Sequence, residues 1–261
     1  MADVALVRRI EDAQLSVWPG VRTAIDGSWI VRISGGHTNR ANSLNILDPA
    51  DADDAERRFG WASGLYRRAG FPMVVRVTPL TPEPVVAIAD ARGFARFGET
   101  LMLVHDDPAA LAAASASGGA VEVRETASEA FIDAVARFSG YSQAATGGFR
   151  AILGAMADEA AFVTARTQAG APASCLIAAL HRDVATVFAV VTDRKERRRG
   201  YARQTLEAAY RWAADGGARL FWIGVEADNA PAQALYRSYG FRETYRYHYR
   251  RALPPAEKGT G

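Results

Sequence analysis

The sequence has little cysteine, little net charge and no long apolar run. Its 261 residues include one cysteine, Cys175, which excludes an intramolecular disulfide framework and a zinc site built from cysteine clusters. Lysine and arginine number 31 against 29 aspartate and glutamate, a formal charge of +2, so the chain is not a strongly basic protein of the chromatin type. A membrane span needs about 18 consecutive apolar residues, and no window approaches that length, so we predict no membrane partner.

The first residues, MADVALVRRIEDAQ, carry charges of both signs where a signal peptide would be apolar, so we expect a soluble, unexported protein. A single thiol suits the reducing cytoplasm, which is the location that we predict. At 49% hydrophobic and 23% charged residues, the composition is that of a globular protein and excludes disorder for most of the chain.

Small, flexible residues mark one boundary at residues 115–119. The length allows one large domain or two of about 100–150 residues. We therefore predict a first unit over residues 1–115 and a second over residues 120–253. We also predict a frayed tail over residues 254–261, because PPAEKGTG has no apolar pattern.

The sequence of the second unit predicts strands and helices that alternate along the chain. Apolar runs predict strands, and apolar residues at helical spacing, next to polar caps or glycines, predict helices. The predicted strands cover residues 121–124, 161–167, 174–181, 184–192, 220–225 and 241–250, and the predicted helices begin near residues 129, 149, 201 and 229. This order predicts an α+β fold with a mixed central sheet and flanking helices, rather than a doubly wound repeat.

The order of predicted elements is less regular in the first unit, and one of its segments is similar to a segment of the second. It predicts a strand at residues 28–34, a helix at 52–69, and apolar runs at 73–77 and 100–104. GLYRRAGF at residues 64–71 matches ALYRSYGF at residues 234–241 at five of eight positions. One interpretation is a repeated supersecondary unit. The other is chance similarity between two helix ends, each of which needs a glycine before the next strand.

The most informative stretch is VFAVVTDRKERRRGYA at residues 187–202, where an apolar strand runs through a polar loop into a helix. Unpaired N–H groups in the first turn of a helix attract anions, and Gly200 and Ala202 let a phosphate approach the backbone. Six basic side chains stand here against one acid, Glu196: Arg194, Lys195, Arg197, Arg198, Arg199 and Arg203. The pattern favours a pyrophosphate site. A solvated charge run or a nucleic-acid patch is the alternative, but neither needs to lie between a strand and a helix start.

This segment resembles the GNAT superfamily of acyl-CoA-dependent N-acyltransferases. The family's phosphate loop reads Arg or Gln, two residues, Gly, one residue, then Gly or Ala, and Arg197, Gly200 and Ala202 match it. Later matching features follow in the family's order: Asn229, Leu235-Tyr236 and Gly240-Phe241. The resemblance covers residues 121–251 and implies the GNAT fold, acetyl-CoA as cosubstrate and no metal.

The resemblance also implies how the cofactor lies. Backbone groups of one strand bind the pantetheine arm where two strands splay apart, and loop N–H groups bind the pyrophosphate. The implied cofactor-binding residues are Val190, Val191, Arg197, Arg198, Arg199, Gly200, Tyr201, Ala202 and Asn229. Asn229 also fits an ordinary helix N-cap, and the two roles are compatible.

Tyr236 matches the family's general acid, which protonates the departing CoA thiolate. The alternative is that Tyr236 packs its helix against the sheet. Because the family's amine attacks the thioester directly, no cysteine nucleophile is needed, and we predict that Cys175, in the apolar segment SCLIAAL, is a buried core residue.

The general base is harder to identify. Glu226 is the first choice because it ends a buried strand near the expected splay, and Asp193 is the second choice. We reject His181, because it would lie more than about 20 Å from the splay at about 3.3 Å per residue.

In the first unit, WIVRISGGHTNRANSL at residues 29–44 resembles a phrase in bacterial GNAT proteins that carry a GNAT-like half before the active one. No Arg-x-x-Gly-x-Ala loop precedes Leu65-Tyr66, so we predict a degenerate half that binds no acyl-CoA. This half would form one wall of the acceptor pocket, and Arg32 or Arg40 could pair with a substrate carboxylate there. The alternative is that residues 37–42 form a structural turn.

Together these observations predict an N-acetyltransferase that moves an acetyl group from acetyl-CoA to a primary amine by direct attack in a ternary complex. A catalytically silent acyl-CoA sensor or interaction module is the alternative, and a nucleic-acid binder using residues 194–203 is a third. We expect a small-molecule amine or amino acid as acceptor and no nucleic-acid partner, and we leave a homodimer open.

Overall fold

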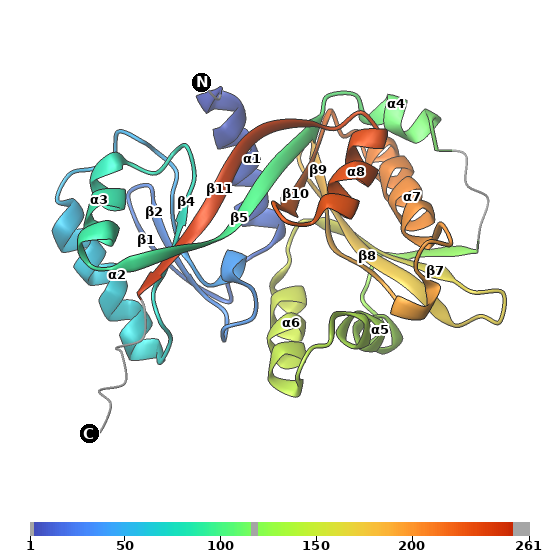
Figure 1. Cartoon of the computed structure of the whole chain (residues 1–261), viewed down its shortest axis with the longest axis horizontal. Helices are drawn as coiled ribbons and strands as arrows, with labels where there is room; N and C mark the ends of the chain where they lie inside the picture. Colours follow the sequence, from blue (N-terminus) through green and yellow to red (C-terminus); the bar gives the residue numbers. More distant parts are fainter. Residues whose placement is uncertain (1–2, 116–119, 253–261) are drawn as a thin grey trace.

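The computed structural model describes residues 3–115 and 120–252, so the predicted tail at 254–261 and residues 116–119 of the predicted boundary lie outside the described residues. Eleven strands within the described ranges form one continuous sheet, in the order β1-β2-β3-β4-β11-β5-β10-β9-β8-β7-β6 (Figure 1). The strands are β1 (Arg22–Asp26), β2 (Trp29–Ile33), β3 (Leu44–Ile46), β4 (Val74–Val77), β5 (Phe94–His105), β6 (Val121–Arg124), β7 (Glu159–Arg166), β8 (Pro172–His181), β9 (Val184–Thr192), β10 (Leu220–Glu226) and β11 (Arg242–Ala252).

Helices flank this sheet, which confirms the predicted α+β class. They are α1 (Val4–Val17), α2 (Ala55–Ala69), α3 (Glu83–Ala91), α4 (Pro108–Ala113), α5 (Glu129–Ser139), α6 (Gln143–Ala155), α7 (Tyr201–Asp215) and α8 (Ala230–Ser238), with short 3-10 turns η1 (Asn39–Ala41) and η2 (Arg194–Glu196). One core packs side chains of α1, α5 and α6 on one face of β8 to β11, and a second packs α4, α7 and α8 on the other face. A third core holds α2 and α3 against β2, β3 and β4.

The two predicted units share the middle of the sheet. β11, from the end of the chain, pairs antiparallel with both β4 and β5, which belong to the first unit. β5 in turn pairs antiparallel with β10. In Figure 1 the long strands β5 and β11 run side by side through the centre of the molecule. The division at residues 115–120 stays a prediction, and the sheet runs across it without a break.

The start of α6 differs from the prediction, which placed it at residue 149. The helix begins at Gln143, where the Ser142 hydroxyl caps it by accepting from the Ala145 N–H at 3.2 Å. Gly147 and Gly148 obscured this start because glycine costs about 1 kcal/mol inside a helix. A Cβ at position 148 would lie 2.5 Å from the His37 Cβ, so the close approach of His37 requires a glycine here.

Candidate active site

The site forms where two parallel strands part. β9 and β10 pair only over their first residues, from Leu220 opposite Val184 to Trp222 opposite Thr186. Both strands continue beyond this point, β9 to Thr192 and β10 to Glu226, without further pairing to each other among the described residues. The unpaired ends leave backbone N–H and C=O groups facing the gap between the strands.

A bulge on β9 adds to these free backbone groups. On the neighbouring strand β8, Cys175 pairs with Val191 and Ile177 pairs with Phe188, so β9 has one extra residue between the pairs. Ala189 lies in this bulge with a φ of +48°, a left-handed conformation that is rare for a residue with a side chain. Within the described ranges, neither Ala189 nor Val190 has a register partner on either neighbouring strand. Their backbone can therefore bind an extended ligand.

A groove of about 790 Å³ passes through this gap. Its walls come from β9, β10, the loop before α7 and the first turns of α7 and α8, with one side chain from the first unit. The predicted site residues that line it are Val190, Arg197, Arg198, Gly200, Tyr201, Ala202, Glu226, Asn229 and Tyr236. The structure thus gathers nine of the predicted residues around one groove.

The loop before α7 presents an uncapped helix start to the groove. Gly200 is the N-cap residue at a φ of +84°, and within the described residues no side chain bonds to the first-turn N–H groups. A Cβ at Gly200 would meet nothing within 4 Å, so the space beside the helix start is open. Arg198 also has a positive φ, +62°, which turns the backbone toward the same point. This geometry favours an anion at the start of α7.

The charge of the loop is directed at the same place. Arg199 pairs with Glu196 at 3.0 Å, and the Arg203 guanidinium lies 5.3 Å from the centre of the Tyr239 ring. Arg197 and Arg198 line the groove and form no ion pair with any described residue. Two unpaired cations beside an uncapped helix start suit a group with several negative charges, such as a pyrophosphate.

Tyr236 lies on α8 with its ring in the core and its edge on the groove. The residue is 5% exposed, and its ring packs 6.2 Å from the Phe241 ring. Burial raises the pKa of the Tyr236 phenol to about 12, so the phenol stays protonated at neutral pH. None of the described residues forms a hydrogen bond with its hydroxyl. The side chain therefore both packs the helix and offers a proton donor to the groove.

Asn229 and Glu226 line the groove between the end of β10 and the start of α8. The Asn229 side chain caps α8 by accepting from the Ala232 N–H at 3.2 Å, which is the ordinary capping role, and it also lines the groove. Glu226 ends β10 with an exposed carboxylate. It stands opposite Thr100 of β5, on the same face of the sheet as Gly224.

Two predicted cofactor residues lie outside this groove. Val191 packs toward the core, and its carbonyl accepts from the Ser174 hydroxyl at 2.9 Å. Arg199 is held by Glu196, as described above. Asp193, the second choice as base, caps the 3-10 turn η2 by accepting from the Lys195 N–H at 2.9 Å. Their roles in cofactor binding or catalysis stay predictions.

Cys175 and His181, which the sequence analysis rejects as nucleophile and as base, both contact other side chains. The Cys175 thiol is fully buried and lies 3.9 Å from the Thr164 hydroxyl, which confirms a core cysteine. Burial raises the pKa of this thiol to about 11, so it is not a ready nucleophile. His181 pairs with Asp158 at 2.9 Å and stands opposite Val184, at the end of β9 away from the gap.

The sequence did not single out several of the backbone and apolar residues that line the groove. Among them, Phe188 precedes the bulge, Ala189 lies in it, and Gly224 lies on β10 across the gap. Arg40 reaches the groove from η1 in the first unit, with its guanidinium 5.2 Å from the Phe188 ring centre. The sequence predicts Arg40 as a carboxylate partner, but its position beside β9 follows only from the tertiary structure.

The structure also resolves the polar segment at residues 37–42. The Asn42 side chain accepts from the Ser34 N–H at 2.7 Å and donates to the His37 carbonyl at 2.7 Å. His37 is buried against the Tyr141 ring, with centroids 4.9 Å apart. The segment is therefore a structural turn, as the alternative held, and this turn carries Arg40 to the groove.

Over residues 3–115 and 120–252, no helix combines the length and hydropathy needed to cross a membrane. Across the same ranges, no three histidine, cysteine or acidic side chains are grouped as a metal site.

Comparison with known proteins gives consistent matches. The family model described as "Probable histone acetyltransferase Rv0428c C-terminal" matches residues 4–250. The chain is 22% identical over 246 residues to "Uncharacterized N-acetyltransferase YobR" of Bacillus subtilis (strain 168), which covers 94% of this chain and 98% of that protein. It is similar in structure to a GCN5-related N-acetyltransferase from Kribbella flavida, with a TM-score of 0.71, 16% identity and 95% of each chain covered. A tandem GNAT protein from the clavulanic acid biosynthesis pathway gives a TM-score of 0.67 at 16% identity, over 95% of this chain and 89% of that one.

Proposed function

Since the chain belongs to the family described as "Probable histone acetyltransferase Rv0428c C-terminal" and has the GNAT fold, we propose that it transfers an acetyl group from acetyl-CoA to a primary amine. The observation that carries the proposal is the single groove in which the basic loop, the β9 bulge and Tyr236 meet. The predicted two-half GNAT architecture agrees with the tandem GNAT neighbour.

The residues of the groove fit the chemical parts of acetyl-CoA. The uncapped start of α7, with Arg197 and Arg198 beside it, would hold the pyrophosphate. The unpartnered backbone of Ala189 and Val190 would bind the amides of the pantetheine arm as an added strand does. Acetyl-CoA supplies the acetyl group as a thioester, which this placement would bring into the gap between β9 and β10.

The chain's own groups then serve the two proton transfers. Glu226, at the end of β10, would take the proton from the attacking amine, directly or through water. The amine nitrogen bonds to the carbonyl carbon and the carbon–sulfur bond breaks. Tyr236, protonated at neutral pH, would donate its proton to the leaving thiolate. Its raised pKa makes full transfer to a thiolate unfavourable in isolation, so its contribution rests on positioning within the groove.

The arrangement of charge supports a cofactor loop over a nucleic-acid patch. Arg197 and Arg198 converge with apolar strand residues on a groove, whereas a surface for nucleic acid would spread its cations along a face. The silent acyl-CoA sensor shares every cofactor contact and differs only in turnover.

Two measurements test the proposal together. Calorimetry should show acetyl-CoA binding to the full chain, and a free-thiol assay over a panel of amines should show CoA release. Glu226→Gln should lower kcat about 10²-fold or more while leaving acetyl-CoA affinity unchanged. Absence of acetyl-CoA binding would overturn the proposal, and binding without turnover of any amine would favour the sensor.

A further inference from the structure

The interior of the first unit holds an arginine without a partner. Arg32 on β2 is 1% exposed, and within the described residues both of its terminal nitrogens lack a hydrogen-bond acceptor. Burial, together with the charge of Arg76, lowers the pKa of the Arg32 guanidinium to about 9, so it is still charged at neutral pH. A buried, unpaired charge is strongly unfavourable, so natural proteins rarely keep one without a use.

The nearby carboxylate is already occupied. Glu11 of α1 accepts from Arg76 Nη2 at 2.9 Å and from the Tyr245 hydroxyl. Arg40 is the third cation of this region, since its charge also acts on Arg32. Arg40 stacks on Phe188 and forms no ion pair with a described residue. Of the three guanidinium groups, only that of Arg76 pairs with Glu11, and neither Arg32 nor Arg40 forms an ion pair with a described residue.

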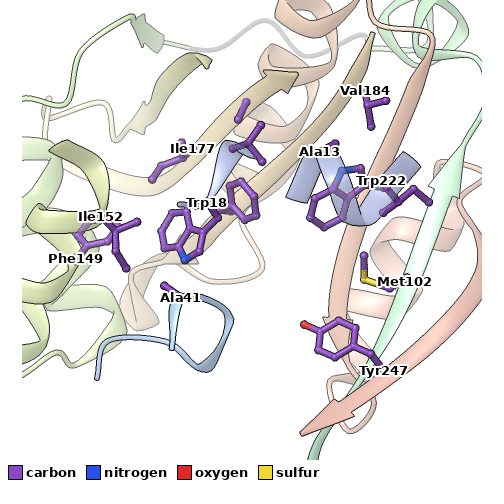
Figure 2. Packing of buried hydrophobic residues seen from close by; sticks show 14 of the residues in the cluster. Ala13, Trp18, Ala41, Met102, Phe149, Ile152, Ile177, Val184, Trp222 and Tyr247 are labelled. Carbon is purple, nitrogen blue, oxygen red and sulfur yellow. The ribbon is translucent and has the colours of Figure 1, made fainter. Parts of the chain in front are cut away.

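Arg76 lies on the face of the sheet opposite the core that contains Tyr236, because its ring partner Tyr247 belongs to the other core. Glu226, Thr100 and Tyr247 are register neighbours across β10, β5 and β11. Tyr247 contacts the Arg76 guanidinium, 3.8 Å from its ring centre. Figure 2 shows Tyr247 beside Met102, with Trp222 next along the same core face. Arg40 is the side chain common to this region and the groove.

The two sides of the groove thus differ in character. The loop before α7 supplies Arg197 and Arg198 to the groove, and α8 supplies Tyr236. The end of β10 supplies Glu226 and η1 supplies Arg40, whereas Arg32 is buried on β2 and does not line the groove. An acceptor would place its amine near Glu226 and the rest of its structure toward Arg40.

Resting on the proposed function, we propose that the acceptor is a small amine that also carries a carboxylate, as a free amino acid does, and that Arg40 binds this carboxylate while the buried charge of Arg32 strengthens the positive field there. The planar fork of a guanidinium matches the two oxygens of a carboxylate, which favours this anion. A carboxylate would supply the negative charge that Arg40 and Arg32 lack, whereas Arg76 already has Glu11. An amine without one would leave two guanidinium groups unpaired, which a site built for pairing strongly disfavours.

The test compares each standard amino acid with its primary amide, using the full chain, saturating acetyl-CoA and detection of released CoA thiol. The amine of the amide is less basic than that of the amino acid, so more of it is unprotonated and able to react at neutral pH. Faster turnover of the amino acid would therefore reflect recognition of its carboxylate rather than a more reactive amine. We expect at least one amino acid to be acetylated with a kcat/KM about tenfold or more above that of its amide. Turnover confined to amides, alkylamines or peptide amines would overturn the inference, as would neither binding nor turnover of any amino acid by a protein that binds acetyl-CoA. Failure to bind acetyl-CoA would instead overturn the proposed function.

Two variants locate the carboxylate site. Arg40→Gln should raise the KM for the amino acid about tenfold or more while the calorimetric Kd for acetyl-CoA stays within about twofold. Arg32→Met keeps the length of the side chain and removes the buried charge, so it should raise Tm by about 2–6 °C while raising the acceptor KM. Arg67→Gln, at an exposed position of α2, is the matched control and should change neither quantity. A lower Tm with unchanged KM in Arg32→Met would assign Arg32 a structural role and overturn its part in binding.

Discussion

Tyr66 and Tyr236 occupy the same position in the repeated phrase but meet different surroundings. Both phrases end a helix in the same way: the Phe71 N–H bonds to the Tyr66 carbonyl at 3.1 Å, and the Phe241 N–H bonds to the Tyr236 carbonyl at 3.3 Å. The Tyr66 hydroxyl donates to the Arg32 carbonyl at 3.0 Å, whereas the Tyr236 hydroxyl borders the groove. The two helices therefore end alike, but the Tyr66 phenol bonds to the backbone of β2, whereas the Tyr236 phenol is available to the groove.

Replacing Tyr236 with phenylalanine tests whether its hydroxyl is the general acid. Tyr236→Phe should lower kcat about 10²-fold or more, because only the proton donor is lost. The acetyl-CoA Kd and the free energy of unfolding should change little, since the ring keeps its packing. Tyr210→Phe, whose hydroxyl is buried outside the groove, serves as control and should leave kcat unchanged. Equal kcat values for the two variants would assign Tyr236 to packing alone.

Cys175 gives stability a dependence on pH in the alkaline range. Its thiol titrates near 9 when unfolded and near 11 when folded, so between these values the unfolded chain loses a proton that the folded chain keeps. Deprotonation therefore favours the unfolded state, and stability falls as pH rises through this window. Urea unfolding should show that the stability advantage of the wild type over Cys175→Ala narrows by about 2 kcal/mol between pH 8 and 10.5. A difference that is constant with pH would contradict the shift.

Among the elements, β9 and α7 could be predicted from the sequence and the gap between β9 and β10 could not. The ends of β9 agree with the prediction, and α7 starts at Tyr201 as expected. A glycine N-cap, a basic loop and an apolar run are local signals, and they identified the loop side of the groove. The bulge at Ala189 and the early end of pairing with β10 depend on two neighbouring strands, so no single segment could reveal them.

The first unit was the harder half to predict for the same reason. α1 has its apolar residues at helical spacing and an Asp3 cap, yet the prediction did not include it. β5 begins at Phe94, six residues before the predicted apolar run, because its first part alternates with polar residues while it pairs with β11. Arg32 and Arg40 were identified as residue types, but their burial and stacking follow from packing alone.

Two neighbouring charge reversals in the loop before α7 test whether this loop binds the phosphates of acetyl-CoA. Arg198→Glu places a negative charge in the groove and should weaken acetyl-CoA affinity about ten- to hundredfold. Arg199→Glu makes the same charge change one residue on, at a side chain that lies outside the groove, and should weaken affinity less. Both positions are exposed, so Tm should stay near that of the wild type. Calorimetry measures both affinities, and equal losses would indicate a general field of charge rather than a defined phosphate site.

In the whole molecule, β11 is the element that joins the two predicted units. It lies between β4 and β5, so the strands of the first unit that would otherwise neighbour each other both pair with the last strand of the chain. α1 adds a second link, because Arg9 pairs with Asp183 at 2.8 Å across the molecule. The predicted division at residues 115–120 would therefore separate chain segments that need each other's strands.

Production of residues 1–115 and 116–261 as separate chains tests this dependence. We expect each fragment alone to be unfolded or aggregated, since unpaired edges of β4, β5 and β11 would be exposed. Produced together, the fragments should copurify and give the circular dichroism spectrum of the intact chain. A monomeric, folded fragment 116–261 that binds acetyl-CoA with full affinity would instead favour two independent domains.

The central position of β11 also sets an order on folding during synthesis. A ribosome adds about 5–20 residues per second, so on the order of ten seconds pass between the emergence of β5 and that of its partner β11. Through that interval β4 and β5 lack the strand that lies between them in the finished sheet. Unpaired strand edges can pair with other chains, so the nascent first half is exposed to such pairing until β11 emerges and fills the centre of the sheet.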